Sequence, residues 1–208
     1  MDSTPLLPLS LLPPVAQVQT FQRKECLPAI LDRVWHIEQG VVRAITWDEN
    51  GHVTTLGLWG QGDITGQPLT RQHPCSFECS TLVKVIATSL NSLSHCWQSV
   101  LLRHLWHQED LLKIVRQPSV LERLAQLLHW LAQRFGRPVP QGQLLDPLLT
   151  HQQLAEILGI SRVTVTRALN RLEQDGLLVR FKEASGKRPN QASYGLPCHS
   201  LLLKYDNK

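Results

Sequence analysis

Two short helical patterns joined by a single glycine constrain the fold of this chain most, and they lie in its last third. Thr150 and Gln153 have the spacing of a capping box, in which the two side chains satisfy backbone groups at the start of a helix. Gly159 suits the left-handed turn that ends such a helix, and Ser161 is placed to cap a second one. Two short helices around a glycine turn, with small Ala155 at their crossing, predict a helix-turn-helix whose recognition helix starts at Ser161.

The second helix is expected to present polar side chains from its first turns. Its inward positions are Val165, Ala168, Leu169 and Leu172. The same spacing turns Arg162, Val163, Thr164, Thr166 and Arg167 outward. Arg162 and Arg167 are separated by about 1.4 helical turns, so both can face one groove of DNA. The arginine fork matches the O6/N7 edge of guanine, which makes these two residues candidates for base reading.

The distribution of charge favours a polyanion near the same region. The net charge is +4, but residues 1–117 hold 9 basic and 10 acidic residues, whereas residues 118–208 hold 12 and 7. Only the second half is therefore expected to meet nucleic acid. Strand-like runs at 177–181 and 192–196 flank a basic turn and predict a β-hairpin wing, with Lys182, Lys187 and Arg188 at phosphates. A solvated helix pair in an ordinary helical core is the competing interpretation, but it does not explain why these features coincide.

The first half has the pattern of short strands. The runs are Val34–Ile37, Val41–Trp47, Val53–Trp59, Ser76–Thr81 and Leu82–Ala87. Turn residues separate them, including Asn50-Gly51, a hairpin signal. Frequent short strands predict an antiparallel barrel or sandwich. Residues 1–20, rich in Pro and Leu, are expected to form an irregular lead-in.

A long amphipathic helix is predicted from Trp97 to Val115. Leu101, Leu105 and Leu112 follow helical spacing, and neighbouring apolar residues widen the face enough for one side on its own domain and another on a partner. Pro118 interrupts this pattern, and the next helix opens with the capping spelling Ser119–Glu122. We therefore expect domains at 1–95, 96–117 and 118–208.

This organisation resembles the cyclic-AMP receptor/fumarate–nitrate regulator (Crp/Fnr) family of bacterial transcription factors. The resemblance covers about residues 33–197 and is strongest in Thr150–Ala155 and Ile160–Arg167, with weaker matches in Ile37–Gly40 and Gly62–Gly66. The Ser161–Arg167 spelling is especially similar to the cyanobacterial nitrogen-regulator branch, and sulfur-responsive relatives fit too. The resemblance implies an α+β fold: an N-terminal antiparallel β-roll (a cupin-like sensor), a long dimerisation helix and a C-terminal winged helix-turn-helix.

The resemblance also implies a homodimer through the Trp97–Val115 helix, a palindromic double-stranded DNA operator and RNA polymerase as a partner. Arg162 and Arg167 would read guanines. Val163 stands where the cyclic-AMP receptor branch has glutamate, so the half-site should depart from TGTGA towards GTA-N8-TAC. The residues expected at phosphates or setting register are Thr150, Gln152, Ser161 and Thr164, and Thr166 joins the DNA-binding set. Activator and repressor fit equally, since operator position decides between them.

The sensor half lacks the cyclic-AMP signature. Family members that bind it carry Gly-Glu-Leu/Ile and then Arg-Ser/Thr-Ala, whereas this chain has Gly66-Gln67-Pro68-Leu69 and His73-Pro74-Cys75-Ser76. A buried phosphate without its arginine is prohibitively costly, so cyclic AMP is not the expected effector and the cofactor stays unassigned. The 2-oxoglutarate arginines of the nitrogen branch align near Cys75 and Pro118. Arg71, Arg103 or Arg116 are the remaining substitutes.

The cysteines and histidines of the sensor half leave two alternatives open. Cys26, Cys75, Cys79 and Cys96 lie there, and Cys198 makes the count odd, which argues against a disulfide framework. Cys75 and Cys79 would lie ~13 Å apart on a strand and are expected to be buried structural thiols. A redox, iron–sulfur or haem-sensing regulator is one alternative, and an effector-free regulator is the other. His104 and His107 are too few for a metal site.

Enzyme and membrane classes are not indicated. The chain has no P-loop, GxSxG or HExxH motif. No apolar run reaches the ~18 residues of a membrane span, and the first residues lack a basic stretch, so we expect a cytoplasmic protein. A partner-binding module that has lost DNA recognition is a third class, which the arginines at 162 and 167 disfavour.

Overall fold

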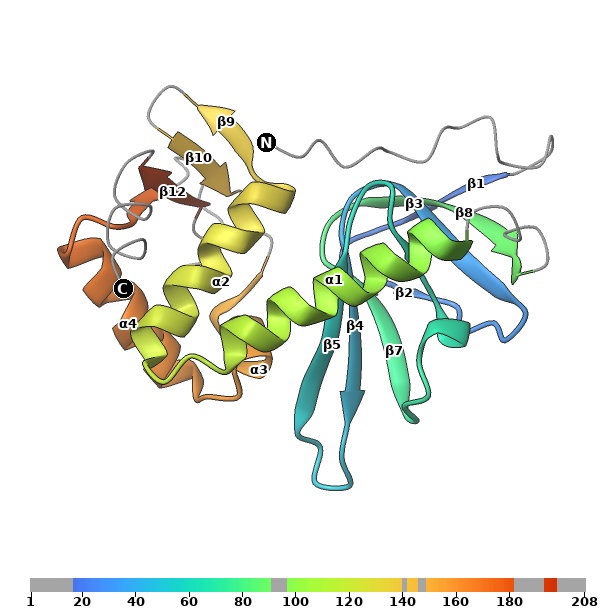
Figure 1. The fold of residues 1–208 in the computed structure, drawn as a ribbon, viewed down its shortest axis with the longest axis horizontal. Coiled ribbons are helices and arrows are strands. Elements are labelled where there is room, and N and C mark those ends of the chain that lie inside the picture. The colour runs from blue at the N-terminus through green and yellow to red at the C-terminus, as the bar shows by residue number, and fades with distance from the viewer. Residues whose placement is uncertain (1–16, 91–96, 140–141, 146–148, 182–192, 198–208) are drawn as a thin grey trace. The chain divides into compact units, whose positions relative to one another are not determined.

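The computed structural model describes residues 17–90, 97–139, 142–145, 149–181 and 193–197. The chain divides into two compact units, Met1–Gln108 and Glu109–Lys208, shown in Figure 1. The boundary between the two units falls inside a long helix. The domain boundaries predicted from the sequence, near residues 95 and 117, remain predictions.

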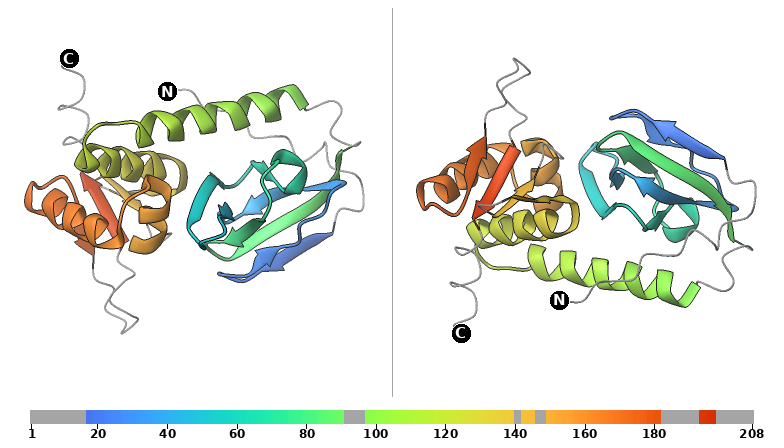
Figure 2. Two further views of the ribbon diagram at one scale, coloured as in Figure 1. Left: turned by 90° about the horizontal axis from the view of Figure 1, so that it is seen from below. Right: turned by 90° about the horizontal axis from the view of Figure 1, so that it is seen from above.

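The first unit is built from two antiparallel four-stranded sheets, as the alternating strand patterns predict (Figure 2). One sheet has the order β1 (Val18–Phe21), β8 (Val83–Ser89), β3 (Arg33–Gln39), β6 (Ile64–Thr65). The other has the order β2 (Cys26–Leu27), β7 (Cys75–Cys79), β4 (Val42–Trp47), β5 (Val53–Trp59). A short 3-10 helix, η2, spans Gln67–Leu69. All five predicted strands are present, and the β-roll expectation is confirmed.

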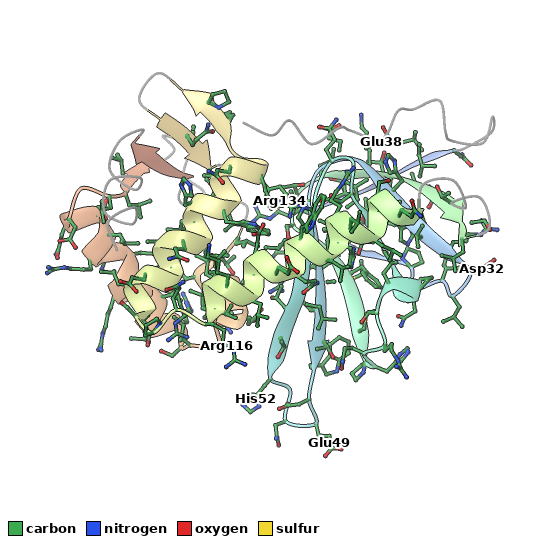
Figure 3. All side chains as sticks on the ribbon, viewed as in Figure 1. Asp32, Glu38, Glu49, His52, Arg116 and Arg134 are labelled. Carbon is green, nitrogen blue, oxygen red and sulfur yellow. The ribbon has the colours of Figure 1, made fainter. Side chains whose placement is uncertain are left out.

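Alternation along the strands builds the core between the two sheets. Trp35 and Ile37 of β3 point inward and meet Val42 of β4 and Phe77 of β7, since successive side chains face opposite sides of a strand. The predicted Asn50-Gly51 turn joins β4 to β5, and Gly51 adopts a positive φ of 79°. Figure 3 shows Glu49 and His52 at the tip of this hairpin.

The expectation of an irregular lead-in over residues 1–20 is wrong at its end. Val18–Phe21 forms β1, which pairs antiparallel with β8 in the register Val18↔Ile86 to Phe21↔Val83. The partner strand lies far along the chain, so local composition does not encode this pairing. Residues 1–16 lie outside the described part of the chain.

The long helix α1 spans Trp97–Val115, as predicted. Val100 packs with Val34 and Ile64. The Arg103 guanidinium donates to the Gly62 carbonyl at 2.9 Å, and the Gln108 amide donates to the Leu56 carbonyl at 2.9 Å. Its opposite side leaves a row of apolar residues exposed, namely Leu101, Leu102, Leu105, Trp106 and Leu112. Within the described residues, no helix has the length and apolar character required to span a membrane.

The second unit contains the helices and a small sheet. The helices are α2 (Val120–Phe135), α3 (His151–Leu158) and α4 (Arg162–Gln174). The strands β9 (Arg137–Val139), β10 (Gly142–Leu145), β11 (Val179–Phe181) and β12 (Ser193–Pro197) form a sheet in the order β11-β12-β10-β9. Ser119 caps α2 as predicted, because its side chain accepts from the Glu122 N–H.

Pairing of β11 with β12 provides the two strands of the predicted wing. Its tip, with Lys182, Lys187 and Arg188, lies outside the described residues. The β9–β10 hairpin was not predicted from the sequence, because a three-residue strand with a proline carries almost no period-2 signal.

Candidate nucleic-acid interface

The first helix of the helix-turn-helix begins with the predicted capping box. The Gln153 N–H donates to Thr150 Oγ1 at 3.2 Å, and the Thr150 N–H donates to Gln153 Oε1 at 2.9 Å. Gly159 ends α3 with φ 63° and ψ 38°, and its N–H reaches the Ala155 carbonyl. A Cβ at Gly159 would meet nothing within 4 Å, so the backbone conformation, and not lack of space, selects glycine there.

The second helix begins at Arg162, with Ser161 as its N-cap. The Thr164 N–H donates to Ser161 Oγ at 3.1 Å, which satisfies one of the backbone donors at the start of α4. The apolar faces of the two helices pack together, and their buried residues are Leu154, Ala155, Ile157, Leu158, Val165, Ala168, Leu169 and Leu172. Both helices are therefore held in a fixed relation by caps and by a shared core.

The predicted base-reading residues lie on the solvent side of α4. Arg162 and Arg167 are exposed, and Val163 is 59% exposed. Figure 3 shows side chains projecting outward from this helix. The structure thus places two guanidinium groups and one aliphatic group together on the first turns of a capped helix.

The predicted phosphate-contacting residues divide into two groups. Gln152 and Ser161 are exposed, whereas Thr150 and Thr164 are half-buried. All four lie at the N-terminal ends of α3 and α4, where backbone N–H groups and the helix dipole favour an anion.

Thr166 is half-buried on α4 and bonds to the other helix. Its hydroxyl donates to the Arg162 carbonyl at 3.0 Å and lies 3.0 Å from His151 Nδ1. A hydroxyl has a single proton, so His151 Nδ1 must carry the hydrogen in the second bond. Thr166 therefore connects the first residue of α3 to the first turn of α4. Sequence spacing could not show this contact, because it joins two helices.

The first unit places Cys26, Cys75 and Cys79 in three different environments. Cys79 is fully buried, and burial raises the pKa of its thiol to about 12. Burial also raises the pKa of Cys75. Cys26 is exposed and lies on a two-residue strand. Cys96 and Cys198 lie outside the described residues. Among the residues that the structure describes, no group of three His, Cys, Asp or Glu can hold a metal ion.

The histidines of α1 pack against an aromatic ring. His104 stacks on Trp59 with a centroid distance of 3.8 Å and an interplanar angle of 12°, and His107 lies 5.7 Å from the same ring. Desolvation lowers the pKa of His104 to about 4, so this ring is neutral at physiological pH.

Arg71, Arg103 and Arg116, the three arginines that could bind an anionic effector, lie in different environments. Arg71 is exposed, and so is Arg116, which Figure 3 shows near the C-terminal end of α1. Arg103 binds the Gly62 carbonyl. At the position of the cyclic-nucleotide glutamate, Gln67 is buried, and its amide lies 3.3 Å from His73 Nε2.

Known proteins match both the second unit and the whole chain. Residues 122–185 match the Crp-like helix-turn-helix domain. The regulatory protein CysR of Synechococcus elongatus is 39% identical over 193 residues, which cover 87% of this chain and 92% of that protein. A global nitrogen regulator of Synechocystis is 29% identical over 188 residues, 81% and 82% of the two chains.

Solved structures agree on the fold. FixK2 from Bradyrhizobium japonicum has a TM-score of 0.70 at 21% identity and covers 88% of this chain and 92% of its own. A CRP-family transcriptional regulator from Thermus thermophilus has a TM-score of 0.69 at 20% identity, with 86% and 91% covered. With this fold, the matched helix-turn-helix and a relative similar over nearly its full length, the chain belongs to the Crp/Fnr family of DNA-binding transcriptional regulators.

Proposed function

We propose that this regulator binds a palindromic operator as a homodimer and that α4 reads the bases in the major groove. The observation that carries the proposal is the exposure of Arg162, Val163 and Arg167 on the first turns of a helix that Ser161 caps and α3 supports. A helix with these properties presents its N-terminal side chains to base edges.

The three side chains point to a half-site of the GTA type. Each arginine can form a bidentate contact with O6 and N7 of guanine. Val163 has no hydrogen-bonding group, so it favours an apolar partner such as a thymine methyl. We therefore propose an operator similar to GTA-N8-TAC, with Thr150, Gln152, Ser161 and Thr164 at phosphates and Lys187 and Arg188 on the wing contacting the backbone.

The exposed row on α1 supports dimerisation. Leu101, Leu105 and Leu112 are spaced by four and seven residues, which is the spacing of a coiled-coil seam, and they are 47–58% exposed in the single chain. Burial of such leucines against a second copy would be favourable by about 1.5–3 kcal/mol per fully buried side chain. A twofold partner supplies the second α4 that a palindrome requires, and RNA polymerase is the proposed partner at the promoter.

The regulator is not expected to respond to cyclic AMP. Gln67 replaces the carboxylate that would hold the ribose, and Arg43, a buried arginine of the β-roll, is already paired with Glu78 at 2.6 Å. The redox alternative is not favoured either, since burial keeps the Cys79 thiol protonated.

Fluorescence anisotropy with the full-length protein tests the proposal. A labelled duplex carrying GTA-N8-TAC should bind far more tightly than a scrambled duplex of equal length, and affinity should fall steeply with salt. Arg162→Ala should remove about 1–3 kcal/mol of operator affinity and relax base preference.

Arg171→Ala is the matched control for this experiment. Arg171 is exposed on the same helix, but it lies in the last turn and pairs with Asp175 at 3.1 Å. Its removal should leave operator preference unchanged. Equal operator affinity of Arg162→Ala and the wild-type protein would refute the proposed docking.

A further inference from the structure

A tryptophan of α2 is bonded to the last turns of α1. Trp130 is only 8% exposed, and its indole N–H donates to Asp110 Oδ2 at 3.2 Å. The part of α1 from Glu109 onward belongs to the second unit, so both partners lie in one compact unit. A buried indole N–H needs an acceptor, and a carboxylate is a stronger acceptor than a neutral oxygen.

Packing around the indole ring holds Trp130 in place on α2. The Arg134 guanidinium lies over the ring, 4.8 Å from its centroid. Phe135 meets the same ring edge-on, with a centroid distance of 6.0 Å. Both arrangements are favourable for an aromatic ring, so the indole has a fixed position from which its N–H reaches Asp110.

The segment of α1 that carries Asp110 has one buried side and one exposed side. Leu111 and Ile114 are buried, whereas Leu112 is 57% exposed and belongs to the exposed row proposed to form the dimer. The bond from Trp130 therefore joins α2 to the part of α1 whose outer side would face a second copy.

The backbone between α1 and α2 does not by itself fix the angle between them. Only residues 116–118 separate Val115, the last residue of α1, from the cap at Ser119, as can be followed in Figure 1. Pro118 has no N–H to donate, and the backbone of Ser119 is extended. Helical hydrogen bonds therefore stop at this turn, and the angle depends on side-chain contacts across it.

Helix α2 is in turn fixed to the helices of the proposed DNA-reading surface. It contacts α4, and the guanidinium of Arg123 donates to the carbonyl of Leu158, the last residue of α3, at 3.3 Å. The angle between α1 and α2 therefore determines where α4 lies relative to the exposed row of α1.

We propose that the bond between Trp130 and Asp110 determines which spacing between two half-sites the dimer accepts. In a symmetric dimer, a change of this angle displaces both copies of α4 together. Asp110 and Trp130 are thus positioning residues that act on DNA through α4. Their effect on operator spacing rests on the proposed function, whereas their effect on the turn between α1 and α2 does not.

Anisotropy titrations of the full-length protein with three duplexes test the effect on spacing. The duplexes carry GTA-N8-TAC, GTA-N9-TAC and a single half-site. One extra base pair rotates a half-site by about 34°. The preference for N8 over N9 should fall about three- to tenfold in Asp110→Ala and in Trp130→Phe, because a less constrained angle accepts both spacings. The affinity for the single half-site should not change, since no DNA contact is lost.

Glu109→Ala is the matched control, because Glu109 is exposed on the same helix and its removal deletes the same charge without deleting the acceptor. It should keep the wild-type preference, and Asp110→Asn, which retains an accepting oxygen, should recover most of it. The double variant Asp110→Ala/Trp130→Phe should lose no more than either single variant, because all three lack the same bond. An undiminished preference for N8 in Asp110→Ala, or additive losses in the double variant, would overturn the proposal.

Hydrogen exchange of the free protein provides a measurement that needs no DNA. At the end of α1, the Arg116 N–H donates to the Leu112 carbonyl at 3.1 Å, and the Gln117 N–H donates to the Ile114 carbonyl at 3.2 Å. Both amides should exchange about three- to tenfold faster in Asp110→Ala and Trp130→Phe than in the wild type and Glu109→Ala. Unchanged exchange would refute the bond as a constraint on the turn, whatever the DNA result. Faster exchange in the variants, combined with no operator binding by the wild type, would refute the proposed function and the control of spacing but not the constraint.

Discussion

The hydroxyl of Thr166 joins two parts of the proposed DNA-reading surface. It donates to the Arg162 carbonyl and accepts from His151 Nδ1, both at 3.0 Å. The first bond ties the side chain to the turn that carries Arg162, and the second ties that turn to the start of α3. In the proposed mode of binding, Thr166 is a positioning residue whose effect on DNA passes through Arg162.

Thr166→Val should weaken operator binding without removing any DNA contact made by an arginine. The substitution keeps the shape but loses two hydrogen bonds, each worth about 0.5–1.5 kcal/mol. We expect operator affinity to fall about three- to tenfold, while binding to scrambled DNA and its salt dependence stay close to wild type. Anisotropy titrations at several salt concentrations measure both.

Thr166→Ser is the matched control for that substitution, since it restores the hydroxyl and should recover operator affinity. A Thr166→Val protein with unchanged operator preference would show that the link to His151 does not position Arg162.

His104 makes the stability of the β-roll depend on pH. Burial lowers its pKa from 6.5 to about 4, so the unfolded chain takes up a proton first as pH falls. Its contribution to folding is complete above about pH 6.5 and is lost as pH decreases towards about pH 4. The shift corresponds to at most about 3 kcal/mol, and contact of the ring with solvent reduces this to about 1–2 kcal/mol.

Urea unfolding at pH 7.5 and pH 5.0 measures this effect. His104→Phe keeps a ring on Trp59 but cannot be protonated, so it should lose about 1 kcal/mol less than wild type between the two pH values. His52→Gln, at an exposed histidine of the β4–β5 hairpin, should behave as wild type. If the wild type and His104→Phe show the same pH dependence of the free energy of unfolding, titratable groups other than His104 cause it.

At the scale of whole elements, the sequence predicted those helices whose capping residues and apolar spacing lie within the helix itself. Thr150, Gly159 and Ser161 determine α3 and α4 through contacts within a few residues, so spacing alone predicted both helices and the turn. The period of α1 likewise gave its limits, Trp97–Val115.

Elements that form only by pairing with distant segments could not be predicted from local sequence patterns. Strand β1 exists because it pairs with β8, and β10 is held by β12, with Leu145 opposite Tyr194. The contact between His151 and Thr166 and the stacking of His104 on Trp59 arise only when separate elements meet. Sequence spacing therefore predicted which residues face solvent on α4 but not what supports them.

The exposed row of α1 leads to a prediction about assembly. Leu105 is 58% exposed, so Leu105→Lys should leave the fold of one chain intact while it places a charge in the proposed dimer seam. We expect the dimer to dissociate at least tenfold more readily, because each copy loses an apolar contact and gains a repelling charge. Sedimentation velocity over a range of concentrations measures this.

Lys113→Ala is the matched control, since Lys113 is exposed on the same helix and has no apolar side chain to bury. Circular dichroism should show equal helix content in both variants. A Leu105→Lys protein that sediments as wild type would place the dimer contact elsewhere on the molecule.

At the scale of the whole molecule, we expect the basic second half to supply affinity for DNA and the apolar row of α1 to supply the dimer on which specificity depends. In the proposed mode of binding, the net positive charge of residues 118–208 gives affinity for any duplex, because phosphate contacts carry no sequence information. Specificity would then come from two copies of α4 acting on two half-sites. Symmetry converts a modest preference at one half-site into a strong preference for the palindrome.

Changing the spacing between the half-sites tests this symmetry directly. B-DNA has about 10.5 base pairs per turn, so five extra base pairs turn one half-site to the opposite face of the duplex. The affinity for GTA-N13-TAC should therefore fall to that of a duplex with one half-site, although every base contact is still available. A duplex with N8 and a scrambled right half gives the single-site reference in the same anisotropy assay. Equal affinity for the N8 and N13 duplexes would mean that one α4 at a time reads DNA, and the proposed twofold mode of binding would then be wrong.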